Sequence, residues 1–362
     1  MRVVTLLHRW AGGLLGLALA MFGLTGTLLL YREAWLRWVL PHAADPATRD
    51  DAAIAAAIAR LTADPARAPQ TIVLASDGFG LDRLIYAGQD RGAYVDQAGA
   101  MVASWSSQRE RPELWLFDLH RHILSGDTGE ALAGGLALVG LGFVVTGTLL
   151  WWRTRRTFAL RAWPRRLSRP AIVRHHRDLG IMVAPVLLVS FLTGAMMALR
   201  PVETLVLRPF ATPSTLAALR KPPAGRWGGL AADPDWRAMI ATARRAYPAA
   251  TIRIVQLPPR PGAPITLRLR QPGEWLPNGS TTLWFDPAGA RLIGTRDALA
   301  LPIGPRLATI EYPLHAGKLG LLAWKAALTI AGIVLTMLGT LAVASFWGMG
   351  SRARPAGAAG AG

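Results

Sequence analysis

Four long stretches without a charged residue constrain this chain most, and a histidine stands shortly before each of them. The uncharged runs cover residues 11–31, 131–152, 179–199 and 326–349. They follow the segments Leu7-His8-Arg9-Trp10, Leu119-His120-Arg121-His122, His175-His176-Arg177 and Leu314-His315. Each run has about 20 residues or more, which at a rise of about 1.5 Å per helical residue is enough to cross a bilayer. The sequence therefore predicts an integral membrane protein with four spans.

The positive charge of the chain is placed where it would orient these spans. The formal net charge is +18, and residues 153–178, between the second and third runs, contain nine arginines and one aspartate. Short arginine-rich loops remain in the cytoplasm, whereas loops longer than about 60 residues contribute little to orientation. Both termini are therefore expected in the cytoplasm, and the two long segments between spans are expected on the other side. Since topology explains the charge, nucleic acid is not expected as a partner.

Cysteine is absent from the chain. Its absence excludes disulfides, thiolate metal sites and iron–sulfur clusters. Any redox chemistry must therefore use a bound cofactor.

The two long segments between spans repeat one order of elements. In the first, a helix is expected over 45–63, followed by strands at 71–74, 83–86, 93–96 and 100–102. In the second, a helix is expected over 236–247, followed by strands at 251–257, 265–270, 281–285 and 291–293. The segment Tyr94-Val95-Asp96-Gln97-Ala98-Gly99 matches Trp284-Phe285-Asp286-Pro287-Ala288-Gly289 in register. The chain is therefore expected to be a tandem duplication of span, small α+β domain and span.

Recurring short motifs give the chain a family resemblance. Before the spans stand Leu7-His8-Arg9, Leu119-His120-Arg121, His176-Arg177 and Leu314-His315; inside three of them stand Thr25-Gly26, Thr146-Gly147 and Thr193-Gly194. With the two Asp-x-Ala-Gly turns, they resemble the PepSY-associated transmembrane proteins, which include iron-regulated membrane proteins and inner-membrane ferric-siderophore reductases. The resemblance covers nearly the whole chain. The fourth span departs from it, because Gly339-Thr340 reverses the Thr-Gly order.

The expected fold is membrane α-helical, a four-transmembrane-helix bundle with two periplasmic α+β PepSY-like domains. Its parts are transmembrane helix 1 at 8–31, the first periplasmic domain at 32–118, a histidine-bearing entrance with helix 2 at 119–152, an arginine-rich cytoplasmic loop at 153–174, helix 3 at 175–199, the second periplasmic domain at 200–313, a histidine-bearing entrance with helix 4 at 314–349, and a cytoplasmic tail at 350–362. The resemblance implies a multi-pass protein of the bacterial inner membrane.

The entrance histidines are candidate ligands of haem iron. In an up-down bundle, parallel helices face each other across the core, which would bring His8 to His176 at the cytoplasmic end and His120 to His315 at the far end. Two neutral imidazoles on rigid helices can ligate both faces of one haem. A single histidine near a membrane interface is ordinarily only an amphipathic residue, but four at matching entrances favour ligation. We therefore expect two haem b groups.

Two neighbouring histidines are alternates to the chosen ligands. Adjacent residues on a helix point about 100° apart, so His175 and His176 cannot both face one core. Register with the first entrance selects His176, and the match between the second and fourth entrances selects His120. If a helix start is irregular, His122 or His175 could substitute.

Three arginines directly follow a candidate ligand and could bond haem propionates. They are Arg9, Arg121 and Arg177, and a guanidinium gives charge-assisted hydrogen bonds to a carboxylate. For Arg9 and Arg177, a topology-setting charge is an equal explanation. The threonines of the Thr-Gly pairs are expected to return a hydrogen bond to their own helix backbone.

The resemblance implies a di-haem reductase that carries electrons across the inner membrane and reduces the iron of a ferric siderophore or other ferric chelate in the periplasm, with a quinone or a cytoplasmic donor as the electron source. Two other classes remain open: a haem-free PepSY-type binding or regulatory protein anchored by the bundle, and an iron-chelate permease. A permease predicts polar groups at mid-membrane, which these spans lack apart from small hydroxyls. A simple anchor leaves the entrance histidines unexplained.

Overall fold

The structure is a computed structural model, and it describes residues 1–88, 90–160, 163–164, 166 and 168–348. The chain divides into two compact units. Among the described residues, the bundle unit contains those of 1–28, 120–198 and 321–348, and the sheet unit contains those of 29–119 and 199–320. Each unit draws on both halves of the sequence.

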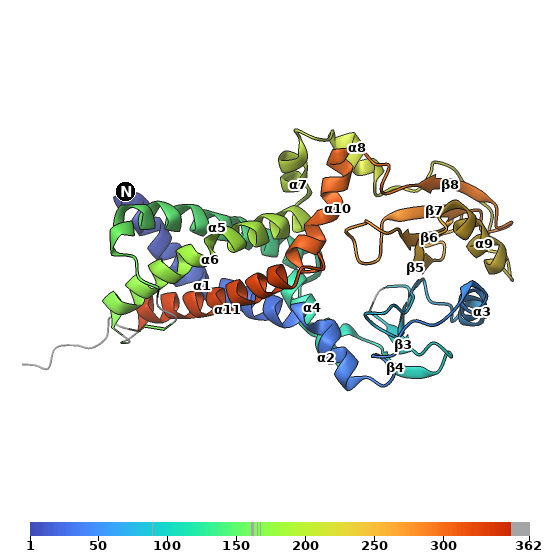
Figure 1. Cartoon of the computed structure of the whole chain (residues 1–362), viewed down its shortest axis with the longest axis horizontal. Helices are drawn as coiled ribbons and strands as arrows, with labels where there is room; N and C mark the ends of the chain where they lie inside the picture. The colour runs from blue at the N-terminus through green and yellow to red at the C-terminus, as the bar shows by residue number, and fades with distance from the viewer. Residues whose placement is uncertain (89, 161–162, 165, 167, 349–362) are drawn as a thin grey trace, which may run out of the picture. The chain divides into compact units, whose positions relative to one another are not determined.

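Four helices of the described chain are long and apolar enough to cross a membrane, as the uncharged runs predict. They are α1 (Arg2–Leu30), α5 (Gly126–Thr154), α6 (Arg169–Ala198) and α11 (Leu322–Trp347), and they lie side by side in Figure 1. Helices α1 and α6 begin before their histidines, so His8 and His176 lie inside the long helices and not in front of them. The expected starts at 8 and 175 are therefore too late, because no helix-breaking residue separates the basic turns from the apolar runs.

The four long helices form a ring in which each touches two neighbours. The contacts that define the ring are Gly16 with Gly339 between α1 and α11, Gly180 with Leu338 between α6 and α11, Gly140 with Phe191 between α5 and α6, and His8 with Thr146 between α1 and α5. Helices α1 and α6 consequently lie across from each other, as do α5 and α11. This is the diagonal relation expected of an up-down bundle.

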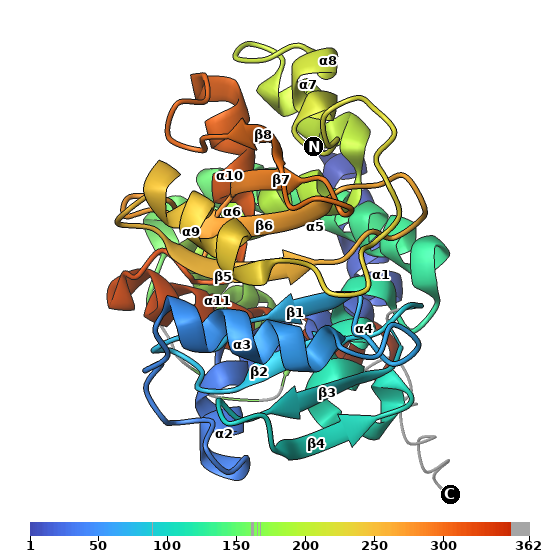
Figure 2. The same cartoon turned by 90° about the vertical axis from the view of Figure 1, so that its right-hand side faces the viewer.

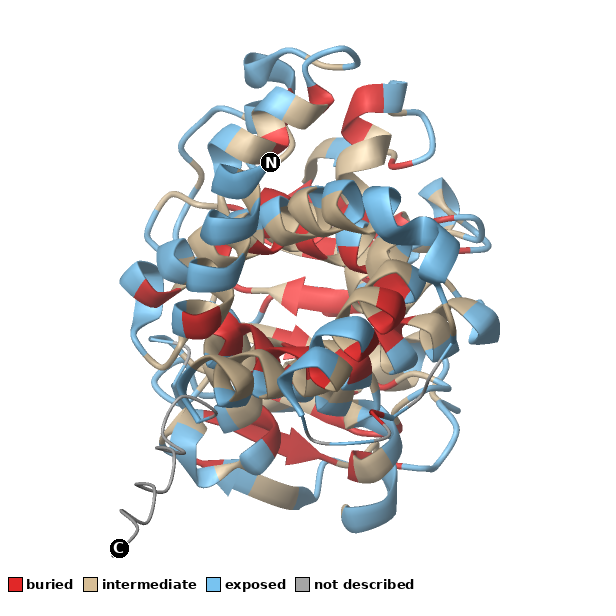
Figure 3. Cartoon of the chain, turned by 90° about the vertical axis from the view of Figure 1, so that its left-hand side faces the viewer, coloured by how far each residue is buried: buried red, intermediate tan, exposed pale blue. Residues whose placement is uncertain are grey.

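The inside of the bundle is apolar. Leu19, Val183, Leu187, Phe191 and Leu338 belong to one buried cluster. Figure 3, coloured by burial, shows buried positions on the inner faces of these helices and exposed positions on their outer faces. Apolar side chains exposed on the outer faces suit a lipid surrounding, because lipid tails are themselves apolar.

Several short helices lie close to the spans in the sequence, and most of their residues belong to the sheet unit. They are α2 (Arg32–Val39), α4 (Pro112–His122), α7 (Arg200–Leu207), α8 (Pro213–Ala218) and α10 (Ile303–His315), and single 3₁₀ turns occur at η1 (Gln108–Glu110) and η2 (Arg155–Thr157). His120 and His315 therefore lie in the last turns of α4 and α10 and not at the heads of α5 and α11. Ile123 and Leu124, with φ of 48° and 57°, end α4 and separate it from α5.

The strands of the two long segments form one antiparallel sheet of eight, whereas the sequence predicts two separate domains. The strands are β1 (Thr71–Val73), β2 (Asp82–Ile85), β3 (Gly92–Val95), β4 (Met101–Trp105), β5 (Thr251–Gln256), β6 (Ile265–Arg270), β7 (Thr281–Phe285) and β8 (Leu292–Arg296). Their order is β4-β3-β2-β1-β5-β6-β7-β8, and Figure 2 shows it. The first strands of the two segments join the halves, with Ile72 opposite Val255.

Two amphipathic helices, α3 (Asp51–Thr62) and α9 (Trp236–Ala246), cover one face of the sheet (Figure 2). Each starts at an aspartate whose carboxylate accepts a hydrogen bond from the backbone three residues on, Asp50 from Ala53 and Asp235 from Ala238. The expected start of the first helix at 45 is therefore wrong, because Asp50 provides the N-cap. Both halves pack into one buried core.

Candidate functional site

His8 and His176 lie next to each other inside the bundle unit. Their ring centroids are 6.2 Å apart and their planes are inclined by 88°. Both side chains are half-buried, and they come from α1 and α6, the helices that lie across the ring from each other. The structure therefore brings together the pair that the sequence places at the cytoplasmic end.

Two histidines in the bundle unit each contact a threonine of another helix. The Nδ1 atom of His8 lies 2.8 Å from Oγ1 of Thr146. The Nδ1 atom of His120 lies 2.8 Å from Oγ1 of Thr25. In both rings Nδ1 is the nitrogen that faces the threonine hydroxyl.

The threonines also bond their own helices, as expected. The hydroxyl of Thr25 donates to the carbonyl of Met21 at 2.8 Å, and that of Thr146 donates to the carbonyl of Gly142 at 2.6 Å. Thr193 does the same toward Val189 at 2.7 Å. The backbone bond is confirmed, but the sequence reasoning missed the second contact to histidine. The signal was present in the recurrence of Thr-Gly pairs in the same spans as the recurrent histidines.

In two of the three Thr-Gly pairs, the glycine leaves room for an imidazole. A Cβ added at Gly26 would lie 3.1 Å from Cε1 of His120, and one added at Gly147 would lie 3.5 Å from Cε1 of His8. Cε1 is the ring atom between the two nitrogens. A larger residue at Gly26 would thus press on the ring between its two nitrogens.

The remaining histidines occupy different surroundings. His315 ends α10 in the sheet unit, while His120 belongs to the bundle unit, and the expected pairing of these two stays a prediction. Of the alternates, His175 is buried next to His176, and Nε2 of His122 lies 3.9 Å from a carboxylate oxygen of Glu130. His42 is exposed, as expected, and contacts Asp45 at 2.9 Å.

The three arginines that follow candidate ligands have protein partners. The guanidinium of Arg9 lies over the ring of Phe346, 5.5 Å from its centroid. Arg121 pairs with Glu130 at 3.0 Å, and Arg177 pairs with the adjacent Asp178 at 2.6 Å. Their expected bonds to propionates stay a prediction, and these contacts would compete with such bonds.

His8 and His176 are the residues that would hold a haem in this unit, each through an imidazole nitrogen. Among the described residues, no three or more histidine, aspartate or glutamate side chains converge on one point. Haem needs only two protein ligands, because the macrocycle supplies the other four nitrogens. The separation of 6.2 Å between the two ring centroids would let both imidazoles reach one metal ion at metal–nitrogen bonds of about 2 Å.

A second group of charges lies in the sheet unit, around α7 and α10. Arg220 donates to both carboxylate oxygens of Glu203 at 2.6 Å. Glu311 is buried, and within the described chain no hydrogen-bond partner reaches its Oε1. Burial first, and then the charge of Glu203, raise the pKa of Glu311 from 4.5 to about 8, against the opposing effect of Arg220. Glu311 is therefore largely protonated at neutral pH.

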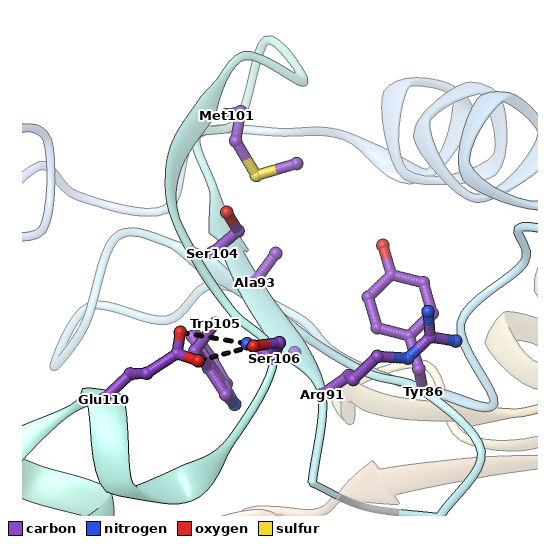
Figure 4. A pocket seen from close by; sticks show the side chains of 9 residues that line it. Tyr86, Arg91, Ala93, Met101, Ser104, Trp105, Ser106 and Glu110 are labelled. Carbon is purple, nitrogen blue, oxygen red and sulfur yellow. Dashed lines mark hydrogen bonds between the residues drawn. The ribbon is translucent and has the colours of Figure 1, made fainter.

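The sheet unit also has a hollow of about 420 Å³ beside the edge strand β4. Figure 4 shows Tyr86 and Arg91 on one side of it and Trp105, Ser106 and Glu110 on the other. The guanidinium of Arg91 lies 5.3 Å from the Tyr86 ring centroid, and Glu110 accepts a hydrogen bond from the backbone of Ser106 at 3.1 Å. Its polar groups bond within their own wall and do not converge on the hollow.

The chain is similar to a known protein family over most of its length. The family described as PepSY-associated TM region matches residues 5–348, nearly the whole chain. A search among curated proteins finds no match. The family match covers all four spans and both halves of the sheet.

Proposed function

The chain belongs to the family of PepSY-associated TM proteins, and from that membership and the histidine geometry we propose that it is a di-haem reductase of the bacterial inner membrane. It would carry electrons outward and reduce the iron of a ferric siderophore or other ferric chelate in the periplasm. Both termini would be cytoplasmic.

Four histidines would hold the cofactors in this proposal. His8 and His176 would hold the inner haem, and His120 and His315 the outer one. When bound, haem supplies reversible one-electron transfer. The protein's own part is to present neutral imidazole nitrogens from rigid helices and to exclude water with the apolar interior of the bundle.

The overall reaction balances with one electron for each iron. A ferric ion in the chelate gains one electron and becomes ferrous, and a quinol or a cytoplasmic donor is oxidised. Chelators built for ferric iron hold ferrous iron less tightly, so the reduction favours release of the metal. The reaction itself requires no acid or base from the protein.

One observation supports the proposal more than any other. His8 and His176 come from helices on opposite sides of the ring, yet their rings lie 6.2 Å apart in a bundle that also holds a buried apolar cluster. Polar side chains inside a membrane are costly and usually serve a function. A plain membrane anchor would have no use for this pair.

The proposal is tested by an absorption spectrum of the detergent-purified protein, oxidised and then reduced with dithionite, with haem quantified per chain. We expect a low-spin b-type spectrum and about two haems per chain. His8→Ala should lower the haem content to about half, because bis-histidine ligation needs both imidazoles. His42→Ala is the matched control and should leave it unchanged, since His42 is exposed in the sheet unit. A colourless preparation from haem-replete cells would overturn the reductase proposal in favour of a binding or transport function.

A further inference from the structure

Spans one and two hold each other's histidines in a reciprocal arrangement. Thr25 on α1 contacts His120, which precedes the second span, and Thr146 on α5 contacts His8 on the first. The two contacts have the same length, the same ring nitrogen and the same Thr-Gly context. Such a repetition at two separate points is not expected of incidental packing.

The hydrogen positions of these contacts follow from counting donors. Oγ1 of Thr25 lies 2.8 Å from the carbonyl of Met21 and 2.8 Å from Nδ1 of His120. A carbonyl oxygen only accepts, so the single hydroxyl hydrogen must point to Met21. The imidazole must therefore donate from Nδ1 to the threonine oxygen. The same count holds at Thr146, whose hydroxyl is engaged with the carbonyl of Gly142.

This arrangement fixes the tautomer of both imidazoles. With the proton on Nδ1, the lone pair lies on Nε2, which is the form a metal requires of a neutral imidazole. A hydrogen bond donated by the far nitrogen also raises the basicity of the ligating nitrogen and fixes the orientation of the ring. A more basic ligand stabilises ferric over ferrous iron.

We propose that Thr25 and Thr146 are positioning residues that hold His120 and His8 as the Nδ1–H tautomer and thereby set the affinity and reduction potential of the bound haems. Gly26 and Gly147 provide the space that each ring needs. The effect on haem rests on the proposed function, whereas the tautomer is a property of the protein itself. The two can therefore be tested separately.

The tautomer is tested first, on the full-length protein in detergent without haem. Nitrogen-15 NMR of the labelled histidines, at alkaline pH where imidazoles are neutral, distinguishes protonated from unprotonated ring nitrogens. We expect two imidazoles to be held as Nδ1–H, one of which becomes a tautomer mixture in Thr25→Val and the other in Thr146→Val. Thr25→Ser and Thr146→Ser should restore the native pattern, because serine keeps the hydroxyl.

The effect on haem is tested by redox titration and haem titration of the same variants. Each valine variant should weaken haem binding at one site about 10- to 100-fold and increase the reduced fraction of that haem at a fixed applied potential. Thr340→Val is the matched control, because Thr340 is exposed and bonds the carbonyl of Thr336 in its own helix at 2.7 Å. Gly26→Ala should disturb haem binding more than Gly147→Ala, since its Cβ would come closer to the ring.

The outcomes separate this inference from the proposed function. Valine variants that keep the native tautomers, the native potentials and full haem binding would overturn the inference and leave the reductase proposal standing. A wild-type protein that never binds haem would overturn the proposed function, and a fixed Nδ1–H tautomer lost in the valine variants would still support the role of the threonines. If a valine variant does not fold, Gly26→Ala and Gly147→Ala, compared with Thr25→Ser and Thr146→Ser, carry the same test.

Discussion

The two halves of the sheet resemble each other more closely than the spans resemble one another. In the sheet, the pairings of β3 with β4 and of β7 with β8 each shift register at the same point of the repeated motif, at Tyr94/Val95 and at Trp284/Phe285. In the spans, the Thr-Gly order is reversed at Gly339-Thr340. The repeat is therefore closer in the sheet than in the spans.

Helix packing gives a physical reason for the difference. A Cβ at Gly16 would lie 2.8 Å from the carbonyl of Gly339, and a Cβ at Gly339 would overlap the carbonyl of Gly16. Gly339 therefore permits close approach of α1 and α11, whereas Gly26 and Gly147 make room for a histidine ring. In the sheet, both halves share the same strand register. In the bundle, the glycines next to threonine have different neighbours, a helix backbone at Gly339 and a histidine ring at Gly26 and Gly147.

The largest effects are expected where the two halves of the sheet repeat each other inside the core. Ile72 in β1 and Ile252 in β5 follow a threonine at the start of equivalent strands and are buried. Ile72→Ala and Ile252→Ala should each lower the free energy of unfolding by about 2–5 kcal/mol, because each removes buried methyl groups and leaves a cavity. Chemical denaturation of the purified protein, followed by circular dichroism, measures both.

Met101→Ala is the control for this pair, since Met101 is 59% exposed on the edge strand β4 and its loss should change stability by less than about 0.5 kcal/mol. Strongly unequal costs for the two isoleucines would show that the halves are not energetically equivalent.

A smaller effect is expected in the spans, at the glycine that departs from the repeat. Gly339→Ala should destabilise the bundle by about 1–3 kcal/mol, because backbone atoms of α1 leave no space for the methyl group. Gly135→Ala on α5 should be neutral or slightly stabilising, because nothing lies within 4 Å of the added Cβ and alanine favours helix. Denaturation of both variants in mixed micelles compares them; equal stabilities would contradict the close approach of α1 and α11.

The smallest effect concerns α4 and α10, the short helices that carry His120 and His315, and it depends on pH. Four residues before its histidine, α4 has Leu116 and α10 has Glu311. The folded pKa of Glu311, about 8, lies above its ordinary value of 4.5, so its contribution to stability is complete below about pH 4.5 and is lost as the pH rises through about 8. Glu311→Gln does not ionise and should lack this loss. At about pH 9 it should therefore be more stable than the native protein.

Thermal unfolding at several pH values between about 5 and 9 tests this last expectation. Glu110→Gln is the control, because Glu110 is exposed and its pKa is lowered by the hydrogen bonds from Ser106, so it titrates below this range. Parallel pH profiles for the native protein and Glu311→Gln would mean that Glu311 does not carry the proton.

Sequence patterns predict the helices and strands of this protein better than they predict which of them pair. Four spans follow from uncharged runs, and the strands follow from alternation between turn residues, because both signals are local. The pairing of Ile72 with Val255 lacks a local signal, since either segment could have closed its own sheet. Equally, the pair of His8 and His176 could be expected from helix directions alone, whereas the contact of Thr25 with His120 joins side chains 95 residues apart in the sequence, and no motif predicts it.

The joining of β1 to β5 has a consequence for how the protein is made. Thr71 pairs with Gln256, so the first strand waits with one edge open until a segment far along the chain has been synthesised and has passed the third span. Exposed strand edges invite pairing with other chains. During synthesis the first half-sheet therefore has an unpaired edge at β1 until β5 has been made.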